Sequence, residues 1–324
     1  MADFVAGSNV HALVAFVFTA LLLRRWRSVG PGARIWYWGG VLAGTLALHP
    51  VLFFLPLRRD DAFRQEWALL DLSRWKSVAV GPVSAWGVLV AAAVATGVAL
   101  LLRDAVPLVA ERMEERVHRR YGTGTTVAAL EAEVSTLSSL LGIRPPRVAL
   151  LDDPGAVLHC ENPFAPVLLV SEGTLSLLDA EERRAALAHE LAHVKAGDLF
   201  ASWALLCIRV LLFFNPVVQL ASRKWLEEVE RRADEVAAHA TGAPLPLASA
   251  LLKLFKATGG GHGGSSDLPG EGWLPEVFHR AESLGVTRRA RLLVDRGTEG
   301  ADPVPRLRFA LTGATVTAIL ILVL

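Results

Sequence analysis

Hydrophobic positions are concentrated towards the two ends of the chain, in long stretches without charge. Segments 4–23, 35–57 and 78–102 contain no Asp, Glu, Lys or Arg, and a shorter apolar stretch occupies 309–324. Each of the first three is long enough to cross a hydrocarbon core of ~30 Å as a helix. Core helices of soluble proteins seldom run this far without a charge. The pattern therefore predicts four membrane spans rather than buried core helices.

Between the third and fourth apolar stretches, polar and apolar positions alternate with the periods of ordinary helices and strands. This middle segment, 104–308, has the length of one globular domain. The predicted class is mainly α: a multi-span helical membrane protein (1–103 and 309–324) that carries a cytoplasmic α+β domain. Within that domain we expect helices at 111–120 and 127–141 and strands at 147–151 and 167–170.

Composition supports the membrane interpretation and excludes several classes of function. Apolar residues make up 52% of the chain and charged residues 20%, and the mean hydropathy is +0.40. A chain this apolar buries enough surface to fold, so it is not intrinsically disordered. Thirty-three basic against 32 acidic residues give a net charge of +1, which predicts no nucleic-acid partner. Two cysteines cannot form a disulfide scaffold.

The distribution of basic residues predicts an orientation for the spans. Basic residues in 24–34, 103–120 and 306–308 outnumber those in 58–76, which is the loop between the second and third apolar stretches. Lys and Arg are enriched on the cytoplasmic side of membrane proteins. We therefore expect a multi-pass protein of the cell (inner) membrane with the central domain in the cytoplasm and both termini outside.

One motif in the central domain carries clear chemistry: His189-Glu190-Leu191-Ala192-His193. Asp179 begins this helix as an N-cap with an acid three residues later, and Gly197 fits its C-cap. Two histidines four residues apart lie on one helix face, so both can bind one metal ion. Glu190 is offset by ~100° and can reach a water on that metal. Two imidazoles with a carboxylate suit zinc. The alternative interpretation of the motif is a solvent-exposed helix with two incidental histidines.

A catalytic zinc needs a third protein ligand, and the candidate is Glu230 in an acidic helical segment, 227–234. Asp234 lies one turn further on the same face, where it can accept the outer N–H of a ligating histidine. The alternative is a solvated acidic face paired with Arg231 and Arg232. Apolar residues around Asp234 favour burial and hence the ligand interpretation, with one Zn²⁺ per chain.

The two metal-binding segments are separated by an apolar stretch, 199–220. Arg209 in its middle and Asn215-Pro216 at a bend favour a hairpin in the membrane interface over a fifth span. Such a hairpin returns the chain so that Glu230 faces the histidine helix. Asp198, just before the hairpin, is interpreted as the N-cap of the next helix rather than as a catalytic residue.

These motifs resemble those of the integral-membrane gluzincin metallopeptidases. The similar residues are His189 to Asp198 followed by Glu230 to Asp234. The layout is similar to that of the BlaR/MecR-type peptidases (metallopeptidase family 56), with three spans, a peptidase domain and a fourth span. HtpX-type and prenyl-protein endopeptidases (family 48) are related. The resemblance implies a zincin-like domain with His189, His193 and Glu230 as zinc ligands and Glu190 as the base.

The resemblance also implies two candidate residues for contact with substrate, and the sequence departs from the BlaR/MecR layout in one respect. Arg288 matches an arginine segment that these peptidases place after the active-site helices, where it would contact substrate or the transition state, and His279 is a second candidate for that role. Receptors of the BlaR/MecR type carry a penicillin-binding sensor after the fourth span. The sequence holds no such segment, so direct β-lactam sensing is not expected.

The resulting hypothesis is a membrane-anchored zinc endopeptidase that hydrolyses cytoplasmic or membrane-proximal proteins. A substrate segment is expected to pair with the strand Val167 to Val170. One alternative is a signal-transducing, antirepressor-type peptidase that works with a separate sensor or repressor protein. Another is a non-catalytic membrane scaffold that has kept the motif.

Overall fold

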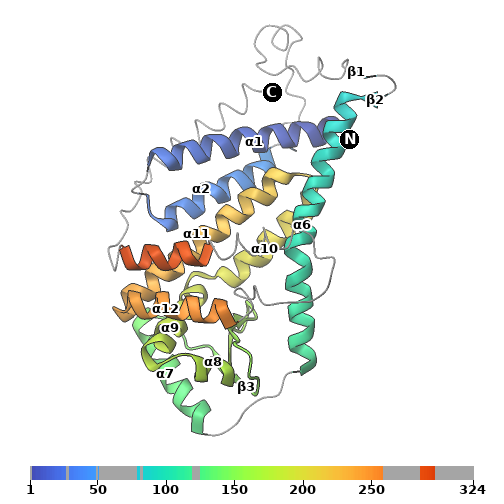
Figure 1. Ribbon diagram of the computed structural model, residues 1–324. Coiled ribbons are helices and arrows are strands. Elements are labelled where there is room, and N and C mark those ends of the chain that lie inside the picture. Colours follow the sequence, from blue (N-terminus) through green and yellow to red (C-terminus); the bar gives the residue numbers. More distant parts are fainter. Residues whose placement is uncertain are drawn as a thin grey trace. The chain divides into compact units, whose positions relative to one another are not determined.

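The computed structural model describes residues 2–26, 29–48, 50, 79–80, 83–118, 125–257 and 285–295. These residues are mostly helical, with one three-stranded and one two-stranded sheet among them (Figure 1). Contacts divide the chain into two compact units. The first unit holds residues 1–112, 204–228 and 301–324, and the second holds 113–203 and 229–300.

The first unit contains the N-terminal apolar segments. Its elements are α1 (Ala2–Arg25), α2 (Pro31–Ala43) with a π-helical continuation η1 (Gly44–Leu48), β1 (Ala79–Val80), β2 (Val83–Ser84) and most of α6 (Ala85–His118). The predicted helix at 4–23 is confirmed within α1. The third apolar stretch differs from the prediction at its start, because Ala79–Val80 and Val83–Ser84 pair as antiparallel strands and the helix begins only at Ala85. Gly81-Pro82 lies in this segment, and both residue types disfavour a helix interior.

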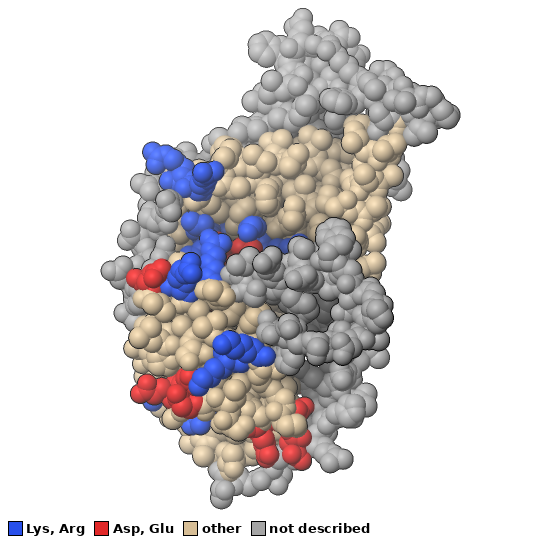
Figure 2. Space-filling model, viewed as in Figure 1, with Lys and Arg blue, Asp and Glu red and all other residues tan. Residues whose placement is uncertain are grey.

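Two helices of the described residues are long and apolar enough to cross a membrane: Phe4–Arg25 and Trp86–Arg103. On the face drawn in Figure 2, most of the surface over α1 is uncharged, and basic side chains appear at the end of the helix, whose last turn holds Arg24 and Arg25. The second predicted stretch, 35–57, is helical up to Leu48, and its remaining residues lie almost entirely outside the described part. The predicted fourth span, 309–324, also lies outside the described residues.

The apolar stretch 199–220 forms parts of two helices with a bend between them, and its place in the membrane interface stays a prediction. Helix α10 (Asp198–Leu211) ends before the bend and α11 (Pro216–Thr241) begins after it. Asn215 is fully buried at the bend, where its side-chain oxygen accepts bonds from the amides of Val217 and Val218 and its nitrogen donates to the Ser8 carbonyl at 3.1 Å. The residues 204–228 pack with α1 and α2 in the first unit.

A close approach of backbones in the first unit gives a testable prediction. A Cβ atom at Gly97 of α6 would overlap the carbonyl oxygen of Phe213 and lie 3.2 Å from the amide nitrogen of Asn215, whereas a Cβ at Gly87 meets only Ser84 at 3.9 Å. Alanine favours a helix over glycine at both positions, although less at Gly87, which lies in the first turn of α6. We therefore expect Gly97→Ala to destabilise the protein by about 1–3 kcal/mol and Gly87→Ala not to destabilise it, as measured by thermal unfolding in detergent. Equal melting temperatures would contradict this packing.

The second unit is built on the three-stranded sheet, with the order β3-β5-β4. Strand β3 (Arg147–Leu151) pairs parallel to β5 (Val167–Ser171), and β4 (Leu158–Glu161) pairs antiparallel to β5 on its other side. The prediction that a substrate pairs with 167–170 is wrong, because β5 is central and both of its edges are occupied. Among the described residues, β3 and β4 are the two outer strands of this sheet.

Helices α7 (Thr125–Leu141), α8 (Glu172–Leu177), α9 (Ala180–Ala196), α12 (Pro244–Phe255) and a helix at 285–295 complete the second unit. Helix α9 is central, since it contacts α7, α12 and β4. Its side chains Leu187 and Leu191 are fully buried in a core that also contains Leu168 of β5 and Leu137 of α7. This core fixes α9, and with it the histidine motif, against the sheet.

Candidate metal centre

The helix that carries the two histidines has defined ends. The Asp179 side chain accepts bonds from the amides of Glu181 and Glu182, and the Glu182 carboxylate accepts a bond from the Asp179 amide at 3.0 Å, which completes the predicted capping box. At the other end, Gly197 adopts a left-handed conformation with φ of 71°, as predicted for a C-cap. Glu182 also binds Lys253 of α12 at 2.6 Å, so the start of α9 is tied to a neighbouring helix.

Within this helix, His189 and His193 present the same ring atom to one point. Their Nε2 atoms lie 3.2 Å apart, and the two rings are nearly perpendicular, at 86°. His189 is buried and His193 is half-buried. Two Nε2 atoms this close together, on a helix whose neighbouring side chains are buried in the core, can both bind one cation.

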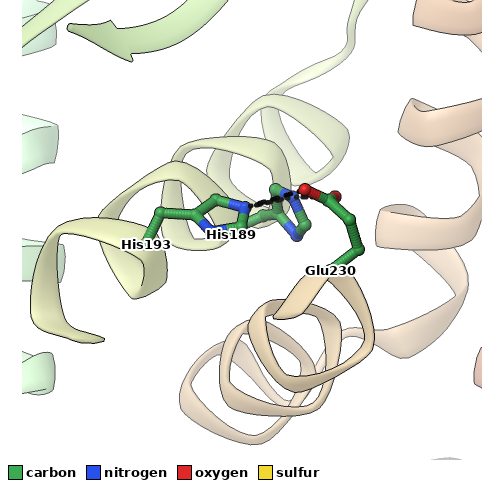
Figure 3. Close-up of side chains that lie close together, drawn as sticks. All are labelled: His189, His193 and Glu230. Carbon is green, nitrogen blue, oxygen red and sulfur yellow. Dashed lines mark hydrogen bonds and ion pairs between the residues drawn. The ribbon is translucent and has the colours of Figure 1, made fainter. Parts of the chain in front are cut away.

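Glu230 of α11 supplies the third donor. Its carboxylate oxygens lie 3.5 Å from Nε2 of His189 and 3.6 Å from Nε2 of His193 (Figure 3). The ligand atoms of the three residues all lie within 4.8 Å of one another. Two imidazole nitrogens and one carboxylate are a donor set that fits zinc. The structure thus brings together the three residues that the sequence spacing selected.

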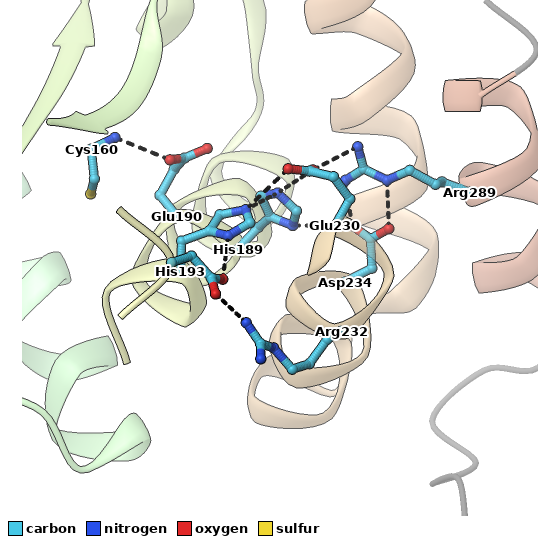
Figure 4. Close-up of polar contacts among 9 residues, drawn as sticks. Cys160, His189, Glu190, His193, Glu230, Arg232, Asp234 and Arg289 are labelled. Carbon is cyan, nitrogen blue, oxygen red and sulfur yellow. Dashed lines mark hydrogen bonds and ion pairs between the residues drawn. The ribbon is translucent and has the colours of Figure 1, made fainter. Parts of the chain in front are cut away.

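The outer nitrogen of each histidine contacts an aspartate. Nδ1 of His189 lies 3.0 Å from Oδ1 of Asp234, and Nδ1 of His193 lies 2.8 Å from Oδ2 of Asp198 (Figure 4). Both aspartates are buried. The contact of Asp198 has hydrogen-bond geometry, whereas that of Asp234 is within ion-pair distance only. Acids placed beside Nδ1 orient an imidazole and leave Nε2 free for a metal. The position of Asp234 one turn from Glu230 predicts its contact with a histidine, whereas the position of Asp198 predicts only a helix cap.

Each aspartate is in turn bound by an arginine. Arg289, from the helix at 285–295, donates from Nε and Nη2 to Asp234, both at 2.7 Å, and its Nη1 lies 2.9 Å from Glu230. Arg232 of α11 pairs with Asp198. Two buried acids are thereby neutralised, which offsets the cost of removing their charges from water.

The electrostatic surroundings shift the pKa values of these residues in a consistent direction. Burial opposes protonation of His189, but the contacts with Asp234 and Glu230 outweigh it and raise its pKa from 6.5 to about 10. Burial likewise opposes ionisation of Glu230 and Asp234, but Arg289 and the histidine hold the pKa of each carboxyl well below its usual value. Without metal, these shifts keep Glu230 and Asp234 ionised and a proton on His189.

This proton predicts the pH dependence of metal uptake. A metal ion needs the Nε2 lone pair of His189, so binding must release the proton. Because the pKa in the folded state is about 10, we expect the apparent zinc affinity to rise about tenfold per pH unit over the range below that pKa. Isothermal titration in buffers of different ionisation enthalpy measures the released proton.

The raised pKa of His189 also stabilises the metal-free fold. This contribution is fully present below pH 6.5 and disappears as the pH rises through about 10.

Glu190 lies beside the metal donors and next to β4, one of the two outer strands of the sheet. Its Oε2 accepts a bond from the backbone amide of Cys160 in β4 at 3.2 Å (Figure 4). Burial, together with the charge of Glu190, raises the pKa of the Cys160 thiol well above its usual range. The thiol therefore stays protonated and does not compete as a metal ligand.

Of the two residues expected to contact the substrate, only Arg288 belongs to the described part of the chain. Arg288 is exposed, and it is the neighbouring Arg289 that reaches the site. His279 lies outside the described residues. A signal for Arg289 was present in the sequence, because Arg289 belongs with the buried Ala290 and Leu293 on one face of a helix.

Three donors that converge on one point and an adjacent acid that is not one of them are typical of zinc metallopeptidases. Comparison with known families gives the same class. The chain matches the family described as BlaR1 peptidase M56 over residues 83–257, and it belongs to that family. The resemblance to BlaR/MecR-type membrane metallopeptidases that the sequence motifs predicted is therefore confirmed.

The chain is also similar to curated proteins named "Protease HtpX homolog". It is 30% identical over 161 residues to that of Acidiphilium cryptum, which covers 39% of this chain and 55% of the relative. It is 29% identical over 165 residues to that of Pyrococcus furiosus, with 38% and 55% covered. A shorter match, 43% over 68 residues, covers 20% of this chain and 22% of the homologue of Desulfatibacillum aliphaticivorans. The chain thus spans about half the length of the first two relatives.

Proposed function

We propose that the protein is a membrane-anchored zinc endopeptidase of the gluzincin type. The observation that carries this proposal is the convergence of His189, His193 and Glu230, whose ligand atoms lie within 4.8 Å of one another. Nε2 of each histidine and the Glu230 carboxylate would hold one zinc ion. Membership of a metallopeptidase family and similarity to HtpX homologues support the assignment.

Zinc, when bound, lowers the pKa of water and polarises a substrate carbonyl as a Lewis acid. The residues of this chain supply the proton transfers and the orientation. The Cys160 amide fixes one oxygen of Glu190, and the carboxylate takes a proton from the attacking water and passes it to the leaving amine. Asp234 and Asp198 hold the two imidazoles in the orientation that directs Nε2 inward.

Strand β4 is the expected docking edge for the substrate. It is one of the two outer strands of the sheet in the described part of the chain, and of these two it is the one whose backbone amide, at Cys160, bonds to Glu190. An extended peptide that adds to this edge forms backbone hydrogen bonds that do not depend on side-chain identity. The scissile bond would then lie next to the base, so the sheet positions the substrate and α9 supplies the chemistry.

The membrane arrangement extends the same proposal. Two candidate spans and the distribution of basic residues support a multi-pass protein of the cell membrane with its peptidase unit in the cytoplasm. The substrates would then be cytoplasmic or membrane-proximal proteins.

Metal analysis combined with a cleavage assay tests the proposed function. We expect the purified full chain in detergent to contain about one zinc ion, as the three-donor site implies, and to cleave casein. A chelator should abolish cleavage and added Zn²⁺ should restore it. Zinc content without cleavage of any protein substrate would favour the non-catalytic scaffold instead.

A signal-transducing role is the second candidate, and the match to the BlaR1 peptidase family favours it. In that case the substrate would be a repressor protein, and a separate protein would supply the sensor. Comparison of cellular proteins between the wild type and an inactive variant distinguishes the two roles, because only this one predicts a single cleaved transcriptional regulator.

A further inference from the structure

Three large aromatic side chains of the second unit are exposed close together; we call Phe164, Phe200 and Trp203 the aromatic cluster. Phe164 is 87% exposed, Phe200 61% and Trp203 55%. The rings of Phe164 and Phe200 lie 6.4 Å apart at 70°, and Trp203 follows Phe200 by three residues on α10, which places it on the same helix face. Large exposed apolar groups that gather in one place mark an interaction surface.

The exposure of Phe164 is built into its loop. Asn162 adopts a left-handed conformation with φ of 64°, and its side-chain oxygen accepts bonds from the amides of Phe164 and Ala165 at 3.1 and 3.2 Å. Pro163 and Pro166 restrict the same loop. The loop is thus a defined turn that directs a phenylalanine outward, where a folded chain gains nothing from it.

The aromatic cluster lies close to the metal centre along the chain. Phe164 follows strand β4, whose Cys160 amide binds Glu190. Phe200 comes two residues after Asp198, which contacts His193. Whatever surface binds the aromatic cluster is therefore connected, through a few residues of chain, to Glu190 and His193.

Helix α10 indicates what that surface is. The exposed face that begins with Phe200 and Trp203 continues along the same helix with Cys207, Val210 and Leu211, which are also exposed. In the first unit, Leu205 of α10 is buried in the cluster that contains Ala15 of α1, and α1 is a candidate span. An exposed apolar face on a helix whose other face packs on a membrane span matches a lipid environment. Trp and other aromatic residues are favoured at the boundary between lipid and water.

We propose that the aromatic cluster inserts into the interface of the lipid bilayer and holds the metal centre at the membrane surface. The substrates of the proposed peptidase, on which this part of the inference rests, would then be segments that emerge from the bilayer. The insertion itself requires no activity, so it is tested separately from the proposed function.

Photocrosslinking tests the insertion directly. The photoreactive analogue benzoylphenylalanine replaces Phe164 or Phe200 in the full chain, reconstituted in nanodiscs of phosphatidylcholine and phosphatidylglycerol. Leu140 of α7 is the matched control, since it is 57% exposed and also belongs to the second unit. We expect lipid adducts, measured by mass spectrometry, at about tenfold the yield of the control. Yields equal to the control, or adducts only with added peptide or with a second copy of the chain, would overturn the proposal.

A cleavage assay tests the consequence for substrates. Phe164→Ser is compared with Leu140→Ser on one peptide sequence, supplied either free in solution or attached to a transmembrane anchor in the same nanodisc. We expect Phe164→Ser to slow cleavage of the anchored peptide about tenfold and to leave cleavage of the free peptide unchanged. Equal loss on both peptides indicates a substrate-binding role and overturns the proposal, as does no loss on either. If the wild type cleaves nothing, the proposed function fails, and the lipid adducts alone decide the insertion.

Discussion

Glu190→Gln is expected to abolish proteolysis while zinc remains bound. Glutamine keeps the shape of the side chain and can still accept a bond from the Cys160 amide, but it cannot take a proton from water. Loss of a general base lowers the rate by about 10²–10⁴-fold. Because Glu190 is not one of the three converging donors, the zinc content should equal that of the wild type. Elemental analysis and casein cleavage on the same preparation measure both quantities.

The matched control for this variant is Glu181→Gln, an exposed acid in the first turn of the same helix. It removes the same charge from α9 away from the metal donors, so its cleavage rate should be unchanged. Wild-type proteolysis by Glu190→Gln would overturn the assignment of the base. Loss of zinc from that variant would show instead that Glu190 is a ligand.

Asp234→Asn is expected to weaken zinc binding about 10–100-fold, which is typical for loss of an acid that orients a ligating histidine. Asp234 contacts Nδ1 of His189 and two donor atoms of Arg289. Without its charge, Arg289 keeps only Glu230 as an anionic partner among these residues, so the guanidinium competes with the metal for the carboxylate. Competition with a fluorescent zinc chelator measures the affinity, and cleavage at saturating zinc shows how much activity the metal restores.

Glu227→Gln is the control for the second variant, since it removes an acid from the same helix. Glu227 pairs with Lys224 at 2.9 Å, and both side chains are largely exposed, so the variant should bind zinc as the wild type does. If both variants weaken zinc binding equally, the effect reflects the general charge of α11 rather than the contact with His189.

Local sequence patterns predicted the parts of the site that depend on one helix. The spacing of His189 and His193 placed both rings on one face, and the cap residues Asp179 and Gly197 marked where the helix begins and ends. Asp234 was found for the same reason, because it lies one turn from Glu230. These features are determined within a few residues of the chain.

The parts that were missed depend on how distant segments meet. Strand β4 has no alternating pattern, and all four of its residues are half-buried, so nothing in the sequence placed it outside β5. The family resemblance located the arginine segment and indicated Arg288. The helix is oriented with Ala290 buried, and in this orientation Arg289 rather than Arg288 reaches the site. Asp198 serves His193 only because the chain turns at Gly197.

The formal charges around the metal centre indicate which ions it can accept. Four carboxylates and two guanidinium groups surround the two imidazoles, which leaves two negative charges when the histidines are neutral. The groups are Glu190, Asp198, Glu230, Asp234, Arg232 and Arg289. A doubly charged ion makes this ensemble electrically neutral, while an alkali ion or a lanthanide would leave an excess of one sign in a partly desolvated place. We therefore expect the surrounding residues, as well as the three donors, to favour a divalent ion.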